Sequence, residues 1–164
     1  YDLYDYPRVD GFTILPTLLH PKSRGTVSLS SSDPKDAPII QPNFLEEKED
    51  LDQLVKGGKL VFKIMKDDAL RKHTLRDRLP FDRDSEESLI EHIKKTLETV
   101  YHPVGTCKMG VDSMAVVDPM LKVQGISNLR VVDASIMPLI VSGNTNAPVY
   151  MIAEKAADMI LNNF

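Results

Sequence analysis

The first candidate for chemistry in this sequence is His102, which is followed directly by a proline. Residues 101–109 interrupt a helical pattern, and Pro103 disfavours a helical conformation at the residue before it, so we expect His102 to be extended. Its neighbours are largely apolar, and burial disfavours the charged form of an imidazole. His102 is therefore suited to act as a neutral base near physiological pH. A purely structural histidine is the alternative interpretation.

The second candidate is the turn at residues 142–149, Ser-Gly-Asn-Thr-Asn-Ala-Pro-Val. Apolar residues recur at helical spacing after it, and Pro148 is typical of the start of a helix. Asn144 and Asn146 then lie where the chain enters a helix N-terminus, whose unpaired N–H groups and dipole favour negative charge. Gly143 permits either a positive φ or a close backbone approach to another group. The pattern predicts an anion site, with an ordinary Asn-capped helix as the alternative.

The remaining candidates carry weaker signals. We expect His73 and His92 to be solvated and His20, which precedes a proline in a turn, to be structural. Cys107 is the single cysteine, so a buried, inert thiol is expected. The sequence has no metal-ligand spacing, no Gly-x-Ser-x-Gly motif and no Gly-x-Gly-x-x-Gly after a predicted strand. Asp133 follows a predicted strand and suits a cofactor contact or a turn equally.

Length and composition limit the classes of protein to which this chain can belong. A chain of 164 residues is long enough for one domain with a sizeable core. A net charge of −4 and the lack of an aromatic-plus-basic stripe argue against nucleic-acid binding. No apolar run approaches the roughly 18 residues that span a bilayer. Residues 1–7 lack the basic and apolar regions of a signal peptide, and they resemble the middle of a longer chain.

The strand signals are short and scattered along the chain. Residues 11–19 and 26–30 are rich in β-forming residues and predict a hairpin across the turn between them. Residues 31–42 contain three prolines and predict a loop. Further β-signals separated by turn sequences are residues 104–108, 116–119, 121–123 and 129–132.

Two capping boxes predict helices in the middle of the chain. Asn43 with Glu46 opens the first, and Gly58 lies on its apolar stripe, which predicts another element crossing closely. Asp84 with Glu87 opens the second. Together with the short strands, these helices predict an α+β fold.

Several motifs in a fixed order carry a family resemblance. They are His-Pro-Lys-Ser-Arg-Gly at 20–25, Tyr-His-Pro-Val-Gly-Thr-Cys-Lys-Met-Gly at 101–110, Leu-Arg-Val-Val-Asp-Ala-Ser-Ile-Met-Pro at 129–138, Ser-Gly-Asn-Thr-Asn-Ala-Pro at 142–148, and the helix at 151–158. The set spans nearly the whole chain. It resembles the C-terminal part of the glucose–methanol–choline (GMC) family of FAD-dependent oxidoreductases, most closely the choline-dehydrogenase and animal glucose-dehydrogenase branches.

The resemblance implies that residues 1–164 form a GMC-type substrate-binding domain. Its expected fold is α+β, a largely antiparallel sheet of about six strands backed by helices, with the C-terminal helix next to the flavin. The Rossmann-like FAD-binding half of the family is absent from this sequence. That half is the expected partner, and FAD is the expected cofactor of the full-length protein.

The resemblance also implies the reaction and its residues. The family oxidises the CH–OH group of an alcohol, such as choline or glucose, by hydride transfer to flavin N5. His102 matches the catalytic base, and Asn144 matches the second catalytic position, which hydrogen-bonds the substrate oxygen. Because a carboxamide has no basic nitrogen, we expect His102 to take the proton. The positions that match FAD contacts are Asp133, Ala134, Thr145, Asn146, Ala147 and Pro148.

The expected partners are a small alcohol and an electron acceptor, either O2 or a quinone. Two alternatives remain: an FAD-containing lyase of the same family, and a non-catalytic module. Without the FAD-binding half, a few backbone contacts would not offset the cost of association, so we expect the isolated chain to be colourless and inactive.

Overall fold

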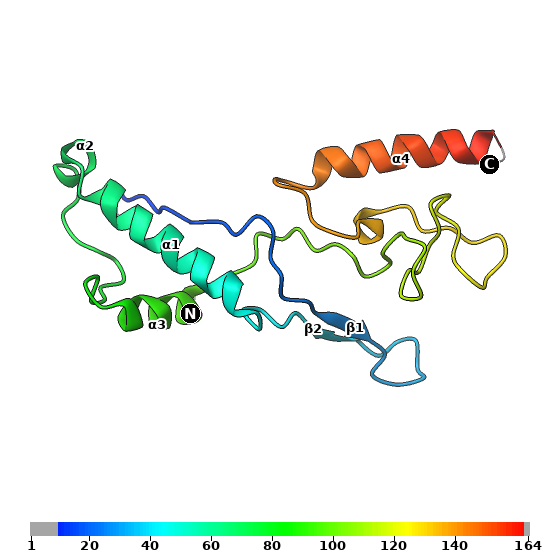
Figure 1. The fold of residues 1–164 in the computed structure, drawn as a ribbon, viewed down its shortest axis with the longest axis horizontal. Coiled ribbons are helices and arrows are strands. Elements are labelled where there is room, and N and C mark those ends of the chain that lie inside the picture. Colours follow the sequence, from blue (N-terminus) through cyan, green and yellow to red (C-terminus); the bar gives the residue numbers. More distant parts are fainter. Residues whose placement is uncertain (1–9, 163–164) are drawn as a thin grey trace. The chain divides into compact units, whose positions relative to one another are not determined.

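The structure, a computed structural model, describes residues 10–162 and has an α+β fold (Figure 1). It contains four α-helices, one short 3-10 helix and a two-stranded antiparallel sheet among those residues. The described residues divide into two compact units. Unit 1 comprises residues 10–23 and Phe44–Glu98, and unit 2 comprises Arg24–Asn43 and residues 99–162. Residues 1–7, where no signal peptide is expected, lie outside the described residues.

Unit 1 is built on a pair of packed helices. Helices α1 (Lys48–Met65) and α3 (Glu86–Thr96) are in contact, and the short α2 (Asp68–Arg71) follows α1. A Cβ added to Gly58 would lie 2.9 Å from the Cδ1 of Leu89, so the glycine allows the two helices to approach. The close crossing predicted from Gly58 is confirmed.

Both predicted capping boxes are wrong about where the helices begin. Asn43 has a positive φ of 52°, and its side-chain amide donates to the carbonyl of Arg24, so it is not available to cap a helix. Helix α1 instead begins after Glu47. Helix α3 is capped by Ser85 rather than Asp84, because the Ser85 hydroxyl accepts the N–H three residues later.

A buried carboxylate ties the 20–25 motif to α1. Asp50 is 2% exposed, and its two oxygens accept the N–H groups of Lys22 and Ser23, both at 2.8 Å. The Ser23 hydroxyl adds a third hydrogen bond at 2.6 Å. A buried carboxylate is stable only when its oxygens are paired in this way. Lys22 and Ser23 are therefore anchored to α1 within unit 1.

The predicted hairpin of residues 11–19 with residues 26–30 is wrong. Strand β1 (Thr26–Ser28) pairs antiparallel with β2 (Ile39–Gln41), which lies inside the predicted loop. Residues 11–19 form no strand, because a proline interrupts them and packs on α1: a Cβ at Gly57 would meet Pro16 Cβ at 2.8 Å.

The sheet is also smaller than expected. Where about six strands were predicted, residues 10–162 contain two, and the other β-signals form isolated bridges. These bridges are Met109↔Val117, Val117↔Val123 and Lys122↔Arg130. Turns separate the β-signals every few residues, so each segment is too short to extend a ladder.

The core of unit 2 lies between the 3-10 helix η1 (Ala134–Ile136) and helix α4 (Asn146–Leu161). Its buried side chains are Val117, Leu121, Ile136, Met137, Ile152 and Ala156. Pro148 is the third residue of α4 rather than the first, so the predicted helix start is two residues late. Proline is tolerated there because the first four N–H groups of a helix have no partner within it.

Candidate functional site

His102 lies on the loop that follows α3, in unit 2, and is half-buried. Tyr101, directly before it, has a φ of 62°, which is uncommon for a residue other than glycine. Backbone strain of this kind is found where the surrounding structure imposes a particular side-chain position. The loop thus holds His102 in one orientation.

Beyond His102, backbone hydrogen bonds anchor the loop to η1. The N–H of Cys107 donates to the carbonyl of Ser135 at 3.0 Å, and the N–H of Met109 donates to the carbonyl of Ile136 at 2.8 Å. Because η1 itself packs against α4, the loop and the helix share one core.

Thr145 links His102 to the start of α4. Its hydroxyl oxygen lies 3.0 Å from Nδ1 of His102, and the threonine is only 7% exposed. Thr145 is also the N-cap residue of α4, yet its side chain does not cap the helix. A threonine at this position usually bonds the helix N–H groups, so here the hydroxyl serves the imidazole instead. This contact could not be predicted from the sequence, because no local pattern marks it.

The contact has a direct chemical consequence for the imidazole. When Nδ1 carries the proton and donates to the Thr145 hydroxyl, Nε2 is the basic nitrogen. When the hydroxyl donates to Nδ1, the proton lies on Nε2 instead. In either case Thr145 fixes the orientation of the ring.

Asn144 precedes Thr145 and is exposed. Consecutive Cα atoms are about 3.8 Å apart, so the chain itself places Asn144 next to the residue that contacts His102. Gly143 does not adopt a positive φ, and a Cβ there would meet nothing within 4 Å among the described residues. Neither reason predicted for that glycine is thus found among residues 10–162.

Asp133 has a clear local role in the structure. Its carboxylate accepts the N–H of Ser135 at 2.8 Å and so caps η1. This is the turn-forming role that the sequence left open beside a cofactor contact. Ala134, the next residue, is half-buried and packs on the core of unit 2.

The first turn of α4 is open to solvent. Asn146 and Ala147 are exposed, Pro148 is half-buried, and the turn contains no acidic residue and no side-chain cap. Unpaired N–H groups at a helix N-terminus carry a partial positive charge. The turn therefore fits an electron-rich group, such as the edge of a flavin ring.

The other candidates lie apart from these residues in the sequence and make different contacts. His73 is exposed, as expected. The prediction that His92 is solvated is wrong: the ring is half-buried and stacks on Phe81, with 4.0 Å between centroids. Burial lowers the pKa of His92, and the charge of Lys95 lowers it further. Cys107 is half-buried rather than fully buried.

Two depressions of about 550 and 350 Å³ lie on unit 1 and include neither His102 nor Thr145. Among residues 10–162, no three His, Cys, Asp or Glu side chains are placed to hold a metal ion. No helix in the same range is both long and apolar enough to cross a membrane.

A family model described as GMC oxidoreductase matches residues 21–153, which include every site residue named above. The chain belongs to the GMC oxidoreductase family. The match confirms the family resemblance drawn from the ordered motifs.

Known GMC proteins resemble this chain over most of its length. It is 47% identical to an alcohol dehydrogenase [acceptor] of Pseudomonas putida, covering 92% of this chain and 28% of that protein. It is 40% identical to choline oxidase of Arthrobacter globiformis, covering 96% of this chain and 30% of that protein. The solved structure of an FAD-dependent oxidoreductase from Chaetomium thermophilum matches with a TM-score of 0.82 and 29% identity. The match covers 88% of this chain and 26% of that one. The chain thus spans less than a third of each of these proteins.

Proposed function

We propose that this chain supplies the catalytic residues of an FAD-dependent GMC enzyme that oxidises the CH–OH group of a small alcohol. The observation that carries the proposal is the 3.0 Å contact between Thr145 and Nδ1 of His102. It connects the candidate base to the start of the helix whose first turn suits an electron-rich ring. Two motifs far apart in the sequence then act at one place.

His102 is the proposed base. With Nδ1 donating to the Thr145 hydroxyl, Nε2 accepts the hydroxyl proton of the alcohol. A positioned base of this kind contributes roughly 10²–10⁴ in rate. Asn144 donates from its carboxamide to the same alcohol oxygen and orients it, because an amide cannot take the proton.

FAD is the proposed cofactor of the full-length protein. Bound FAD would accept the hydride from the alcohol carbon. Asn146 and Ala147 offer backbone N–H groups at the open first turn of α4, and Pro148 presets the backbone there. Asp133 and Ala134 remain predicted FAD contacts, and the observed capping role of Asp133 leaves its second carboxylate oxygen available for one.

The proposed partners follow from the relatives. An alcohol and choline appear in the names of the two curated relatives, and we extend that class, a small alcohol, to this chain. The electron acceptor is O2 or a quinone. The FAD-binding half of a longer protein completes the site, and residues 1–164 act as its substrate-binding domain.

The test compares two variants in the full-length, FAD-loaded protein. Flavin reduction by an alcohol is followed anaerobically by loss of flavin absorbance. We expect His102→Ala to lower the rate by about 10²-fold or more and Asn144→Ala to lower it less. His73→Ala, an exposed histidine of unit 1, is the control and should leave the rate unchanged.

Two results would overturn the proposal. Equal and mild losses of the flavin reduction rate in His102→Ala and Asn144→Ala would contradict the assignment of His102 as the base. Flavin that stays oxidised with every alcohol tried, while the protein cleaves a substrate without net redox change, would instead identify a lyase.

A further inference from the structure

A row of lysines runs along the solvent-facing side of α1, in unit 1. Lys56, Lys59, Lys63 and Lys66 follow one another at steps of three, four and three residues. Residues spaced in this way share one face of a helix. All four are exposed, whereas Gly58, on the opposite side, packs against α3. The row covers about 15 Å of helix length, at 1.5 Å per residue.

Two large apolar side chains lie beside this row. Leu60 is 57% exposed and Ile64 is 42% exposed. They are one turn apart, and each follows a lysine of the row by one position. Neither belongs to the buried core of unit 1. The outer face of α1 thus combines positive charge with accessible apolar surface.

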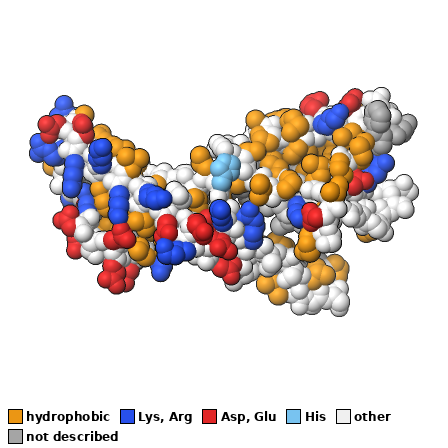
Figure 2. Space-filling view, in the orientation of Figure 1, with side chains coloured by type: hydrophobic (Ala, Val, Ile, Leu, Met, Phe, Trp, Pro, Cys, Tyr) orange, Lys and Arg blue, Asp and Glu red, His pale blue; other side chains and the backbone are white. Residues whose placement is uncertain are grey.

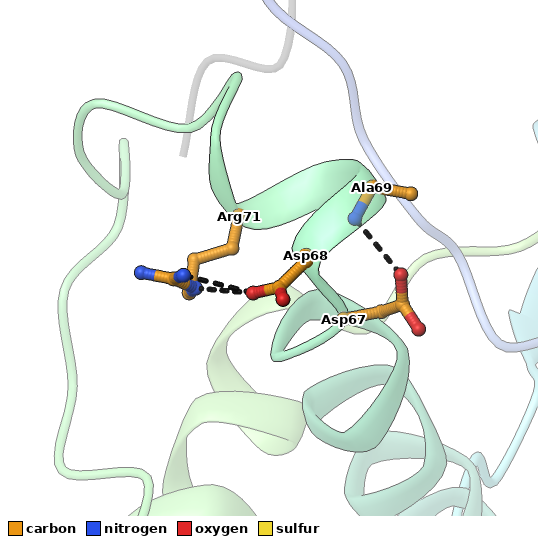
Figure 3. Close-up of polar contacts among 4 residues, drawn as sticks. All are labelled: Asp67, Asp68, Ala69 and Arg71. Atoms are coloured by element: carbon orange, nitrogen blue, oxygen red, sulfur yellow. Dashed lines mark hydrogen bonds and ion pairs between the residues drawn. The ribbon is translucent and has the colours of Figure 1, made fainter.

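Two carboxylates follow the row, and both bond to groups other than its lysines. Asp67 accepts the N–H of Ala69 at 2.9 Å, and Asp68 pairs with Arg71 at 2.8 Å (Figure 3). Lys59 pairs with Glu86, which leaves the other three lysines without an ion pair to any residue in the range 10–162.

Positive charge is concentrated in this part of the chain. Residues 56–78 hold eight Lys and Arg but three Asp and Glu, although the whole chain holds 20 and 24. Figure 2 shows Lys and Arg side chains over the part of the molecule that holds α1 and α2, with Asp and Glu side chains among them. The excess is local, because residues 46–52 just before it hold five Asp and Glu, so the C-terminal half of α1 is the positive part of that helix.

We propose that the outer face of α1 docks on the surface of an anionic lipid bilayer. Lysine rows on an amphipathic helix are attracted to anionic headgroups, and adjacent leucine and isoleucine side chains insert at the boundary of the acyl chains. The helix lies on the membrane and does not cross it. The lysines alone would suit any acidic surface, and the exposed Leu60 and Ile64 beside them favour one with an apolar layer beneath the charge.

The test measures binding of the full-length, FAD-loaded protein to vesicles by co-sedimentation. One set contains equal parts of phosphatidylcholine and phosphatidylserine, and the other contains phosphatidylcholine alone. We expect binding to the first set only, and we expect it to fall as salt is raised because exposed charges are screened. The triple variant Lys56→Gln, Lys63→Gln, Lys66→Gln should bind about a hundredfold more weakly.

A matched variant separates this face from total charge. Lys35→Gln, Lys94→Gln, Lys155→Gln removes the same charge from exposed positions elsewhere and should bind as the parent does. Leu60→Ser with Ile64→Ser should weaken the binding that persists at high salt. Equal losses in both triple variants, or no binding to the anionic vesicles, would overturn the proposal. Because no residue of the His102 site is changed, alcohol oxidation is expected to persist in all three variants, so the two proposals fail separately.

Discussion

The hydroxyl oxygen of Thr145 lies 3.0 Å from Nδ1 of His102, a residue 43 positions earlier in the chain. Thr145 is at the same time the N-cap of α4 and is almost fully buried. One side chain therefore connects a half-buried imidazole to the helix start that carries Asn146 and Ala147.

Removing the Thr145 hydroxyl should impair the base without unfolding the protein. Thr145→Val keeps the shape of the side chain but cannot bond Nδ1, so we expect flavin reduction in the full-length protein to slow by about tenfold. Thr145→Ser keeps the hydroxyl and should retain most of the rate. The pH dependence of the rate should change in Thr145→Val alone. Equal losses in both variants, with unchanged pH profiles, would assign Thr145 a packing role.

Asp50 should be the carboxylate on which unit 1 depends most. Asp50→Ala leaves the N–H groups of Lys22 and Ser23 without their acceptor, and each unpaired donor costs about 1–3 kcal/mol. We expect urea unfolding to show a loss of roughly 2–4 kcal/mol. Asp52→Ala is the matched control, because Asp52 forms only an exposed pair with Lys48 and should cost less than about 1 kcal/mol. Similar losses in the two variants would contradict this ranking.

Gly25 and Gly143 should respond differently to the same substitution. A Cβ at Gly25 would lie 2.4 Å from the carbonyl oxygen of Gln41, in β2, so Gly25→Ala must displace backbone. We expect a loss of about 1–3 kcal/mol and faster hydrogen exchange in the β1–β2 pair. Gly143→Ala meets nothing within 4 Å and should stay within about 0.5 kcal/mol of the parent. Unchanged exchange rates in β1 and β2 of Gly25→Ala would refute the contact.

His92 should make the stability of unit 1 depend on pH. Burial against Phe81, with the charge of Lys95, lowers its pKa in the folded chain. As pH falls, the imidazole is therefore protonated in the unfolded chain before it is protonated in the folded chain. The stability that the neutral His92 contributes is complete above about pH 6.5 and is lost as pH falls below it. His92→Phe keeps the stacked ring without titrating and should flatten the melting temperature between about pH 7 and pH 5. The exposed His73→Gln serves as the control. A pH profile that His92→Phe leaves unaltered would disprove the assignment.

Predictions from the sequence were correct where they rest on a continuous run of residues or on a local periodicity. The motifs at 101–110 and 142–148 identify the family because each is a run of neighbouring residues whose chemistry can be recognised without a fold. The packing of Gly58 could be predicted for the same reason, since helical periodicity is a local property. The capping box at Asn43 failed because its side-chain amide donates to the carbonyl of Arg24, and the box at Asp84 failed because Ser85 caps α3 instead. A cap depends on which donors and acceptors the rest of the chain has already used.

By itself, the sequence determined the family, the α+β class and the identity of His102 and Asn144 as candidate residues. Tertiary structure alone decided that β1 pairs with β2 and that Thr145 contacts His102. Such pairings depend on which segments the core brings together, and a short strand or a lone hydroxyl accepts many partners. For Thr145, packing of η1 against α4 brings the hydroxyl and the His102 loop to one core, where burial makes an unpaired polar group costly.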